Sequence, residues 1–425
     1  MKSLPWLLAG VTAASLAGGP VWGQPVAAPQ AAASVLGTAA GAVTLRAALD
    51  AAWQRSVAAR ESDGQRRRAA ADRAATGHFW AAPPSLDLSH RDDRLQNNGG
   101  RRETEIGVAV PLWLPGQRAA RLGTAEAAAA QALAAEQVAR LHLASELREL
   151  AWQWAALQAE AMQAEAQAQA LQQLADDVER RVQAGDLARA DALAARAEQL
   201  AATALQSDVQ QRLQTARARW ALLTGLTAAP VLVAGVVAAT LADEAAEKAA
   251  LHPEIQLASL STVLARKRVE LMRHSRRDAP ELTVGLRQDV AGRAEASQGS
   301  LVVALRLPLG TSDRNRPLET AALAELDMAL THEQRLRERL DSDAATARDT
   351  QRSARAQLDA KTARARLLRE RATLIDKSFR AGETPLPEQL RALAAAAQAD
   401  SAVARQTTTL GLARARLQQA LGLLP

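Results

Sequence analysis

Cysteine and tyrosine are both absent from this chain of 425 residues, and phenylalanine occurs only twice. Without cysteine the chain forms no disulfide, no thiol nucleophile and no cysteine-ligated zinc site, and it carries no lipid on an N-terminal cysteine. The scarcity of aromatic side chains argues against a large globular core of bulky residues. Alanine, leucine, arginine, glutamine and glutamate are strong helix formers, so the composition favours long helices in thin, closely packed layers.

A long uninterrupted apolar run is also missing. The longest apolar stretch near the N-terminus, residues 4–17, is shorter than the roughly 20 residues that a membrane-spanning helix needs. It follows Lys2 and precedes Val21-Trp22-Gly23, which places small residues at the positions that a signal peptidase requires. We therefore predict a signal peptide over residues 1–23, cleaved after Gly23, and an exported protein without a transmembrane helix.

The charge pattern and the missing motifs exclude several classes of function. Lys and Arg total 52 against 46 Asp and Glu, but this surplus of +6 is spread along helices, and the run Arg66-Arg67-Arg68 lacks the aromatic neighbours of a single-strand nucleic-acid site. No glycine-rich phosphate loop or nucleophile motif occurs. The six histidines form no metal-binding pattern. We predict a protein without catalytic residues, cofactor, metal site or nucleic-acid partner.

The sequence contains an internal duplication with an offset of 197 residues. Ala184-Gly185 recurs as Ala381-Gly382 (382 − 185), and the Ala-Arg-Ala-Arg run that begins at Ala216 recurs at Ala413. Gly225-Leu226 recurs in the same register near the C-terminus. Shared alanine-rich composition inflates self-similarity, but it does not by itself keep several anchors in one register.

The duplication and the linker composition give the domain boundaries. After the signal peptide we predict a Pro/Ala linker (24–43), a first repeat (44–229, with a β-hairpin at 84–113), an inter-repeat linker (230–250) and a second repeat (251–425, with a β-hairpin at 280–309).

Each repeat is expected to hold one long helix and two shorter ones. In the first repeat, residues 117–183 contain no proline and a single glycine, which predicts a helix of roughly 100 Å. The helices predicted over residues 44–76 and 188–224, of about 50 and 55 Å, match that length when placed end to end. In the second repeat, residues 312–316 are predicted to form a turn, with Pro317 in the first helical position of the next long helix.

The hairpins alternate between apolar and polar residues, as in Thr104, Ile106, Val108 and Val110. Strands of 8 to 11 residues with one apolar face have the length of tilted strands in a bilayer, but such a sheet is stable in lipid only when it closes. Four strands cannot close a barrel, so several chains must contribute to one. A soluble sheet that caps a coiled coil is the alternative.

Several motifs resemble those of TolC-like outer membrane efflux proteins. Ala184-Gly185 precedes Asp191-Ala192-Leu193 as Ala381-Gly382 precedes Glu388-Gln389-Leu390. The segment 111–121, His252-Pro253-Glu254-Ile255 and residues 313–316 are most similar to the heavy-metal (cobalt–zinc–cadmium) branch of that family.

This resemblance implies a mainly α fold with a small transmembrane β part. Duplicated helix–hairpin–helix units would form a homotrimer, with a twelve-stranded barrel in the outer membrane and a periplasmic helical tunnel. The expected function is a passive channel for small solutes, with divalent heavy-metal ions as the expected cargo, that works with a periplasmic adaptor and an inner-membrane RND-type pump. Export of drugs or other organic toxicants is one alternative, and a periplasmic coiled-coil adaptor or structural protein is another.

The resemblance also points to the turns at residues 185–191 and 382–388, here called the tip turns. In the family, acidic residues near this position of the second repeat narrow the pore. Glu388 matches that position, Asp191 is its equivalent in the first repeat, and Arg391 is placed to pair with Glu388. A ring of carboxylates would attract cations, whereas for Asp191 an ordinary helix N-terminal acid is an almost equal alternative. The residues expected to dock the adaptor are Gly185, Asp186, Leu187, Gly382, Glu383 and Thr384.

An aromatic belt at the membrane interface is expected at the base of the first hairpin, from Phe79, Trp80 and Trp113. The second hairpin has no aromatic counterpart.

Overall fold

The computed structural model describes residues 43–95, 98–232, 252–309 and 312–425. The predicted signal peptide and almost all of the Pro/Ala linker lie outside these ranges, as does most of the inter-repeat linker. In the described ranges, no helix is both long enough and apolar enough to cross a bilayer.

The first repeat contains helices α1 (Leu45–Arg55), α2 (Val57–Thr76), α3 (Gln117–Ala184) and α4 (Arg189–Thr224). The second repeat contains α6 (Pro253–His274), α7 (Ser312–Arg380) and α8 (Leu386–Ala420). Between α2 and α3 lie strands β2 (Ser85–Asp92) and β3 (Arg102–Pro111), and between α6 and α7 lie β5 (Glu281–Val290) and β6 (Gln298–Arg306). The order helix, hairpin, long helix and helix therefore occurs twice.

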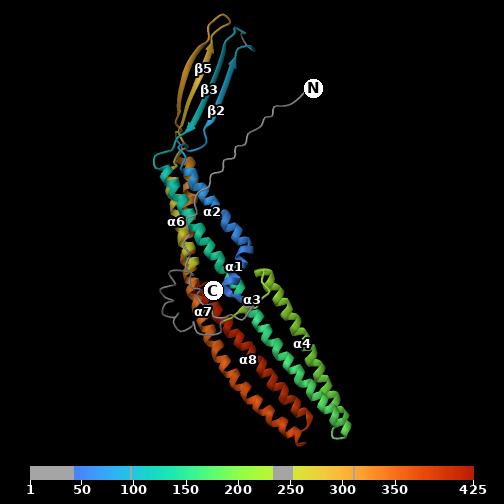
Figure 1. Cartoon of the computed structure of the whole chain (residues 1–425). Helices are drawn as coiled ribbons and strands as arrows, with labels where there is room; N and C mark the ends of the chain where they lie inside the picture. Colours follow the sequence, from blue (N-terminus) through green and yellow to red (C-terminus); the bar gives the residue numbers. More distant parts are fainter. Residues whose placement is uncertain (1–42, 96–97, 233–251, 310–311) are drawn as a thin grey trace, which may run out of the picture. The chain divides into compact units, whose positions relative to one another are not determined.

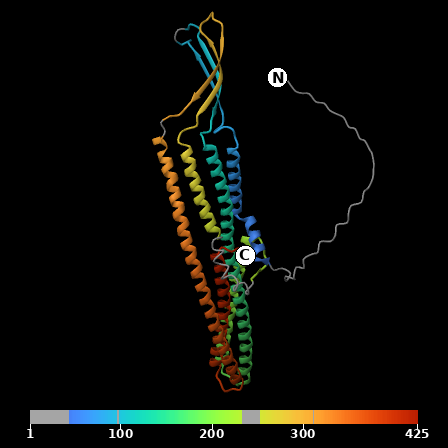
Figure 2. The same ribbon diagram turned by 90° about the vertical axis from the view of Figure 1, so that its left-hand side faces the viewer.

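The four long strands form one antiparallel sheet in the order β2-β3-β5-β6, at one end of the helices (Figure 1). The helices next to the sheet contact one another in the same order, α2-α3-α6-α7. At the far end, the order of contacts is α4-α3-α8-α7. The long helices α3 and α7 thus run through both halves, while shorter helices follow one another along them (Figure 2), as the length matching predicts.

A short parallel ladder, absent from the expectations, joins the start of the first repeat to its end. Strand β1 (Val43–Thr44) pairs with β4 (Pro230–Val231). Beside it lies a core in which Leu49, Leu147, Trp154 and Trp220 are buried, and the two indole rings meet edge to face at 6.0 Å. The aromatic residues that are present thus hold three helices together near the middle of the layer.

Two expectations about helix ends are wrong. The helix predicted over residues 44–76 is divided at Ser56, whose extended backbone ends α1 and begins α2. The Ser56 hydroxyl donates to the Trp53 carbonyl (2.9 Å) and accepts from the Ala59 amide (3.1 Å), so the side chain caps both helix ends.

The turn predicted over residues 312–316 is helical instead. Helix α7 begins at Ser312 and includes Pro317, although a proline inside a helix removes one backbone hydrogen bond. The Asn315 amide donates to the carbonyls of Ser275 and Arg276, and these bonds fix the first turn of α7 against the end of α6.

The end of α8 is fixed to α3 by a buried arginine. Arg148 is 2% exposed, and it donates to the side-chain oxygen of Gln419 (2.5 Å) and to the Leu423 carbonyl (2.7 Å). Burial lowers the pKa of Arg148 to about 10, so the guanidinium stays charged at neutral pH.

Helices α3 and α8 approach so closely at Gly411 that a Cβ atom there would lie 2.0 Å from the Trp152 ring. We expect Gly411→Ala to destabilise the protein by about 1–3 kcal/mol, because the bulky ring or the helix must move. Gly64→Ala, in an open position of α2, is the matched control and should stabilise the protein by about 0.5–1 kcal/mol. Equal midpoints of thermal unfolding for the two variants would contradict this packing.

The environment of His252 predicts that the stability of the fold depends on pH. It caps α6, where its Nδ1 accepts from the Glu254 amide (3.2 Å), and burial lowers its pKa below 6.5 although the Glu254 carboxylate opposes this. The unfolded chain therefore binds the proton more tightly, so the contribution of His252 to stability should be complete above pH 6.5 and decline as the pH falls below it. In thermal unfolding across this range, His252→Asn, a cap that does not titrate, should weaken the dependence, and an unchanged slope would contradict the assignment.

Candidate functional site: the open sheet and the tip turns

One face of the sheet is apolar across all four strands. Two rows of directly paired residues cross it, Leu86, Val108, Val284 and Val303 in one and Leu88, Ile106, Leu286 and Leu301 in the next. All eight are exposed, by 44 to 71%. An exposed apolar patch of this size on a folded chain indicates a surface that meets lipid or another protein.

The opposite face is polar where the hairpins turn. Arg287 of β5 lies 2.9 Å from the Glu103 carboxylate of β3 and 3.7 Å from that of Asp289. Arg91 of β2 approaches Glu103 at 3.7 Å. A sheet with one apolar and one charged face separates an apolar medium from an aqueous one.

Both edges of the sheet are open. Within the described chain, β2 pairs only with β3, and β6 pairs only with β5. The outer amides and carbonyls of these two strands therefore have no strand partner, which in a bilayer would be strongly unfavourable.

The predicted belt residues lie together at the base of the first hairpin. The Phe79 and Trp80 rings meet edge to face at 4.9 Å, and Phe79 is 75% exposed. The Trp113 indole donates to the His78 carbonyl at 3.3 Å. At the base of the second hairpin, Leu307 and Leu309 are exposed instead, so that side presents aliphatic groups.

At the other end of the helices, both tip turns contain a left-handed glycine. Gly185 and Gly382 have φ values of 89° and 79°, a region that favours glycine, and each ends a long helix. The two turns lie near each other, because Val178, Ala195, Phe379 and Leu386 form one buried cluster.

The predicted docking residues differ in exposure. Gly185, Asp186, Gly382 and Glu383 lie on the surface. Thr384 is half-buried, and its hydroxyl forms a hydrogen bond with that of Ser378. Leu187 packs against the buried cluster, so part of its side chain supports the turn itself.

The two acidic residues of the tip turns make different contacts. The Asp191 carboxylate accepts from the backbone amide of Ala188 at 3.3 Å, which is the bond of a helix N-terminal acid. In the second turn, Pro385 occupies the N-cap position and has no amide hydrogen to donate. The Glu388 carboxylate instead binds Arg371 (2.7 Å) and Arg391 (3.0 Å).

Glu388 is therefore surrounded by two positive charges. The pair with Arg391 is the one anticipated from the sequence, whereas Arg371, on the opposite helix of the α7–α8 hairpin, was missed. Counting the antiparallel register back from Gly382 places Asp376 opposite Glu388 (382 − 6), so the sequence contained no signal for Arg371, which lies five residues further back. Two arginines and one carboxylate leave a local charge of +1, so the tip of one chain is not simply acidic.

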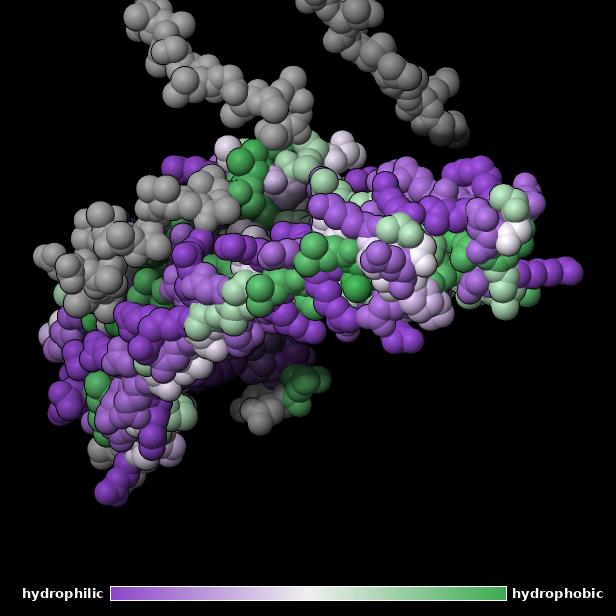
Figure 3. All heavy atoms as spheres, turned by 90° about the horizontal axis from the view of Figure 1, so that it is seen from below, coloured by the Kyte–Doolittle hydropathy of each residue, from purple (hydrophilic) through white to green (hydrophobic). Residues whose placement is uncertain are grey.

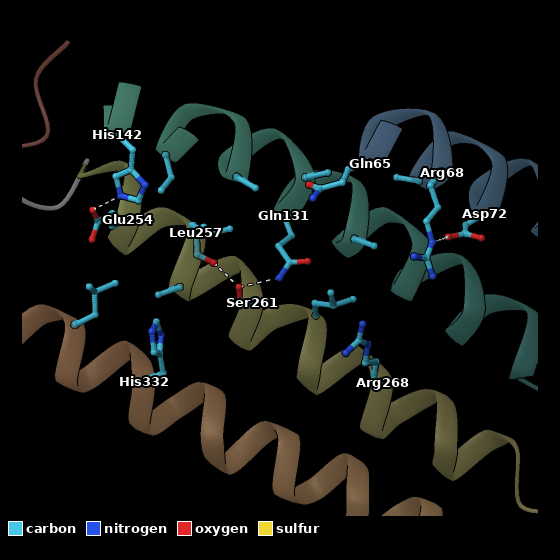
Figure 4. A pocket seen from close by; sticks show the side chains of 18 of the residues that line it. Gln65, Arg68, Asp72, Gln131, His142, Glu254, Leu257, Ser261, Arg268 and His332 are labelled. Carbon is cyan, nitrogen blue, oxygen red and sulfur yellow. Dashed lines mark hydrogen bonds and ion pairs between the residues drawn. The ribbon is translucent and has the colours of Figure 1, made fainter. Parts of the chain in front are cut away.

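A groove of about 640 Å³ lies between α2, α3, α6 and α7 (Figure 4). His142 Nε2 lies 3.1 Å from the Glu254 carboxylate, whose other oxygen is 3.3 Å from Arg339. His332 points into the same groove (Figure 4). Across the described ranges, no group of three metal-binding side chains occurs.

No family model and no curated protein matches the sequence. Solved structures do match. The outer membrane protein VceC of Vibrio cholerae is 16% identical, with a TM-score of 0.72 over 89% of this chain and 96% of its own. CusC, described for its transmembrane channel formation, is 17% identical, with a TM-score of 0.73 over 92% and 96%.

The open state of the MtrE outer membrane channel of Neisseria gonorrhoeae is 15% identical, with a TM-score of 0.67 over 89% of each chain. Identities this low establish the fold and no more. The chain has the TolC-like fold of outer membrane channels, and the fold class predicted from the sequence is confirmed.

Charge at the tip gives a testable prediction. If the tip turns line a pore, as the resemblance implies, Glu388→Gln should leave Arg371 and Arg391 uncompensated. The cation-to-anion permeability ratio in bilayer recordings should then fall by at least about twofold, because charges within a Debye length of a narrow pore select ions. Asp400→Asn is the matched control, since it removes a carboxylate that also pairs with an arginine of α7, 2.7 Å away. If the two variants show the same selectivity, Glu388 does not line the aperture.

Proposed function

We propose that this chain is one subunit of a passive outer membrane channel that takes part in efflux. The observation that carries this proposal is the four-stranded sheet with an apolar face and two open edges, placed at the end of helices about 100 Å long. The likeness to outer membrane channels supports it.

Three copies would close the barrel. All neighbouring strands in the sheet are antiparallel, so β6 of one copy can add to β2 of the next in the same manner and give twelve strands. Closure satisfies the open edges and turns the apolar face toward lipid, with the polar face in the lumen. Phe79, Trp80 and Trp113 would then lie at the periplasmic interface.

The helices would continue the channel through the periplasm, and the export signal predicted for residues 1–23 agrees with this location. The surface residues of the tip turns would meet a periplasmic adaptor that connects the channel to an inner-membrane pump of the RND type. Energy would come from the pump, and the channel itself would be passive.

Divalent heavy-metal ions are the proposed cargo, on the strength of the motifs at residues 111–121 and 252–255. A conduit needs no tight metal site, because permeating ions must also leave it.

Deletion of the chain tests this function. A strain that lacks it should retain zinc, cobalt or cadmium and should tolerate lower concentrations of these metals than the parent strain. The intact chain should restore tolerance and fractionate with the outer membrane. If the deletion strain is sensitive only to organic toxicants, the proposed cargo is wrong but the proposed channel stands. If the protein is recovered only from the soluble periplasm, the proposal of an outer membrane channel is wrong.

A further inference from the structure

The apolar face of the sheet changes to polar and then to charged side chains toward the two hairpin turns, here called the outer end. Beyond the apolar row that contains Ile106, the next row of directly paired residues, here called the polar row, consists of His90, Thr104, Gln288 and Gly299. The row after it consists of Asp92, Arg102 and Val290. Because side chains alternate between the two faces of a strand, both rows lie on the same face as the apolar ones.

The polar row presents hydrogen-bonding groups to the surroundings of the sheet. His90 and Gln288 are exposed, and His90 Nδ1 forms a hydrogen bond with the Thr104 hydroxyl at 2.9 Å. The Gln288 side-chain amide donates to the Ser297 hydroxyl at 2.7 Å. An imidazole, a hydroxyl and an amide therefore lie directly beside the last apolar row.

The carboxylates near the first turn already have partners within their own hairpin. Asp93 accepts from the backbone amides of Gly99 and Gly100 at 2.9 and 3.2 Å, and Asp92 lies 3.1 Å from Arg94. The acids on the opposite face bind arginines of that face. None of these carboxylates neutralises the arginines that follow Gly100.

Three arginines at the outer end have no carboxylate partner among the described residues. Arg101, Arg102 and Arg293 are exposed, and no ion pair is formed by any of them within the described chain. The Arg293 amide donates to the Gly99 carbonyl at 3.1 Å, which joins the second turn to the first. Glu295 in the second turn offsets one charge, so a positive surplus remains, and Arg102 carries it on the apolar face.

No aromatic belt is available at this end. Residues 81–112 and 281–306 contain no Phe, Trp or Tyr, whereas the base of the first hairpin carries Phe79, Trp80 and Trp113. Transmembrane barrels usually have an aromatic girdle at each interface, so other groups must form the outer one here. Arginine suits phosphate, because its planar guanidinium donates two parallel hydrogen bonds to phosphate oxygens.

The order of the rows matches the order of groups in one leaflet of a bilayer. Successive rows are about 7 Å apart along the strands, so Arg102 lies roughly 14 Å beyond Ile106. The distance along the membrane normal is shorter, since strands of such barrels tilt by about 40°. A headgroup phosphate beside the hydrocarbon edge is within this range. The tip end differs, because its surface is mostly hydrophilic with separate hydrophobic patches (Figure 3).

We propose that the outer end of the sheet binds a phosphorylated glycolipid of the lipid A type in the outer leaflet. Its acyl chains lie along the apolar rows, its sugar and amide groups meet the polar row, and a phosphate binds Arg102 with the two arginines beside it. The occupant is a lipid rather than free phosphate, because Arg102 continues the apolar face. This inference rests on the proposed function, which supplies the membrane around the sheet.

Native mass spectrometry of the detergent-solubilised protein tests this binding, with bisphosphorylated lipid A as the probe. The parent protein should retain lipid A, and Arg102→Gln should lower the bound fraction by at least about fivefold, because a charge-assisted contact to phosphate is lost. Arg91→Gln is the matched control. Arg91 is exposed at the same end but belongs to the opposite face, 3.7 Å from Glu103, so this variant should bind like the parent.

Equal binding by the parent and Arg102→Gln, or an equal loss in Arg91→Gln, would overturn the site. Equal binding of lipid A without its phosphates would overturn phosphate recognition. Displacement of lipid A by the same concentration of inorganic phosphate would overturn the lipid as occupant. In each of these cases the particle is still a trimer, so the proposed channel stands. A parent protein that forms no trimer would overturn the proposed function, and this inference with it.

The heat stability of the trimer gives an independent measurement. A ligand that binds only the folded assembly stabilises it, so lipid A should raise the temperature at which the trimer dissociates in the parent and in Arg91→Gln. The rise should be smaller in Arg102→Gln. Arg102→Lys keeps the charge but not the planar guanidinium, and it should give an intermediate rise. The same rise in Arg102→Gln as in the parent would contradict the proposal.

Discussion

The unpaired backbone at the two edges of the sheet is the constraint on which the rest of this structure depends. An apolar face across β2, β3, β5 and β6 suits a bilayer, but hydrocarbon offers no partner for the outer amides and carbonyls of β2 and β6. The sheet is therefore incomplete in one chain. In the proposed channel, added copies would remove the edges, because the antiparallel order of the strands allows each copy to continue the sheet of its neighbour.

Next to the sheet, the helices α2, α3, α6 and α7 follow the same order as the strands. In the proposed channel, one arrangement of copies would therefore join both the sheet and the helices. Small side chains allow the helices to pack closely against one another. Most buried positions of α3 are alanines, so its neighbours approach closely along the length of the helix. Large buried side chains occur in a few clusters between helices, such as Trp220 in the middle of the layer and Phe379 at the tip. Helices packed in this manner form a thin wall rather than a solid core.

The fold could be predicted from the sequence because the internal repeat, the helical spacing of apolar residues and the alternation in the strands each extend over many residues. The change from helical to alternating spacing located both hairpins, and the glycines at 185 and 382 located both tip turns. Local hydrogen bonding decided what was missed. The periodicity predicts one continuous helix across Ser56, but the Ser56 hydroxyl forms hydrogen bonds with the end of α1 and the start of α2 and so divides the helix. Helix α7 continues through Pro317, where Asn315 fixes its first turn.

The candidate site could be predicted only in part, again because local hydrogen bonds and ion pairs determine it. Asp191 and Glu388 occupy equivalent positions in the two repeats, yet Pro385 removes the amide that would hold Glu388 at its own helix end. The freed carboxylate then binds Arg371 from the preceding helix. A sequence shows the proline, but the partner across a hairpin depends on the register of two helices.

The mass of the detergent-solubilised protein is the most direct test of the central claim, that one chain holds only part of a closed barrel. Light scattering corrected for bound detergent should give close to three times the mass of the mature chain, and heating should convert this particle to monomers of different gel mobility. A folded particle with the mass of a single chain would contradict the account, because its sheet edges would remain unpaired.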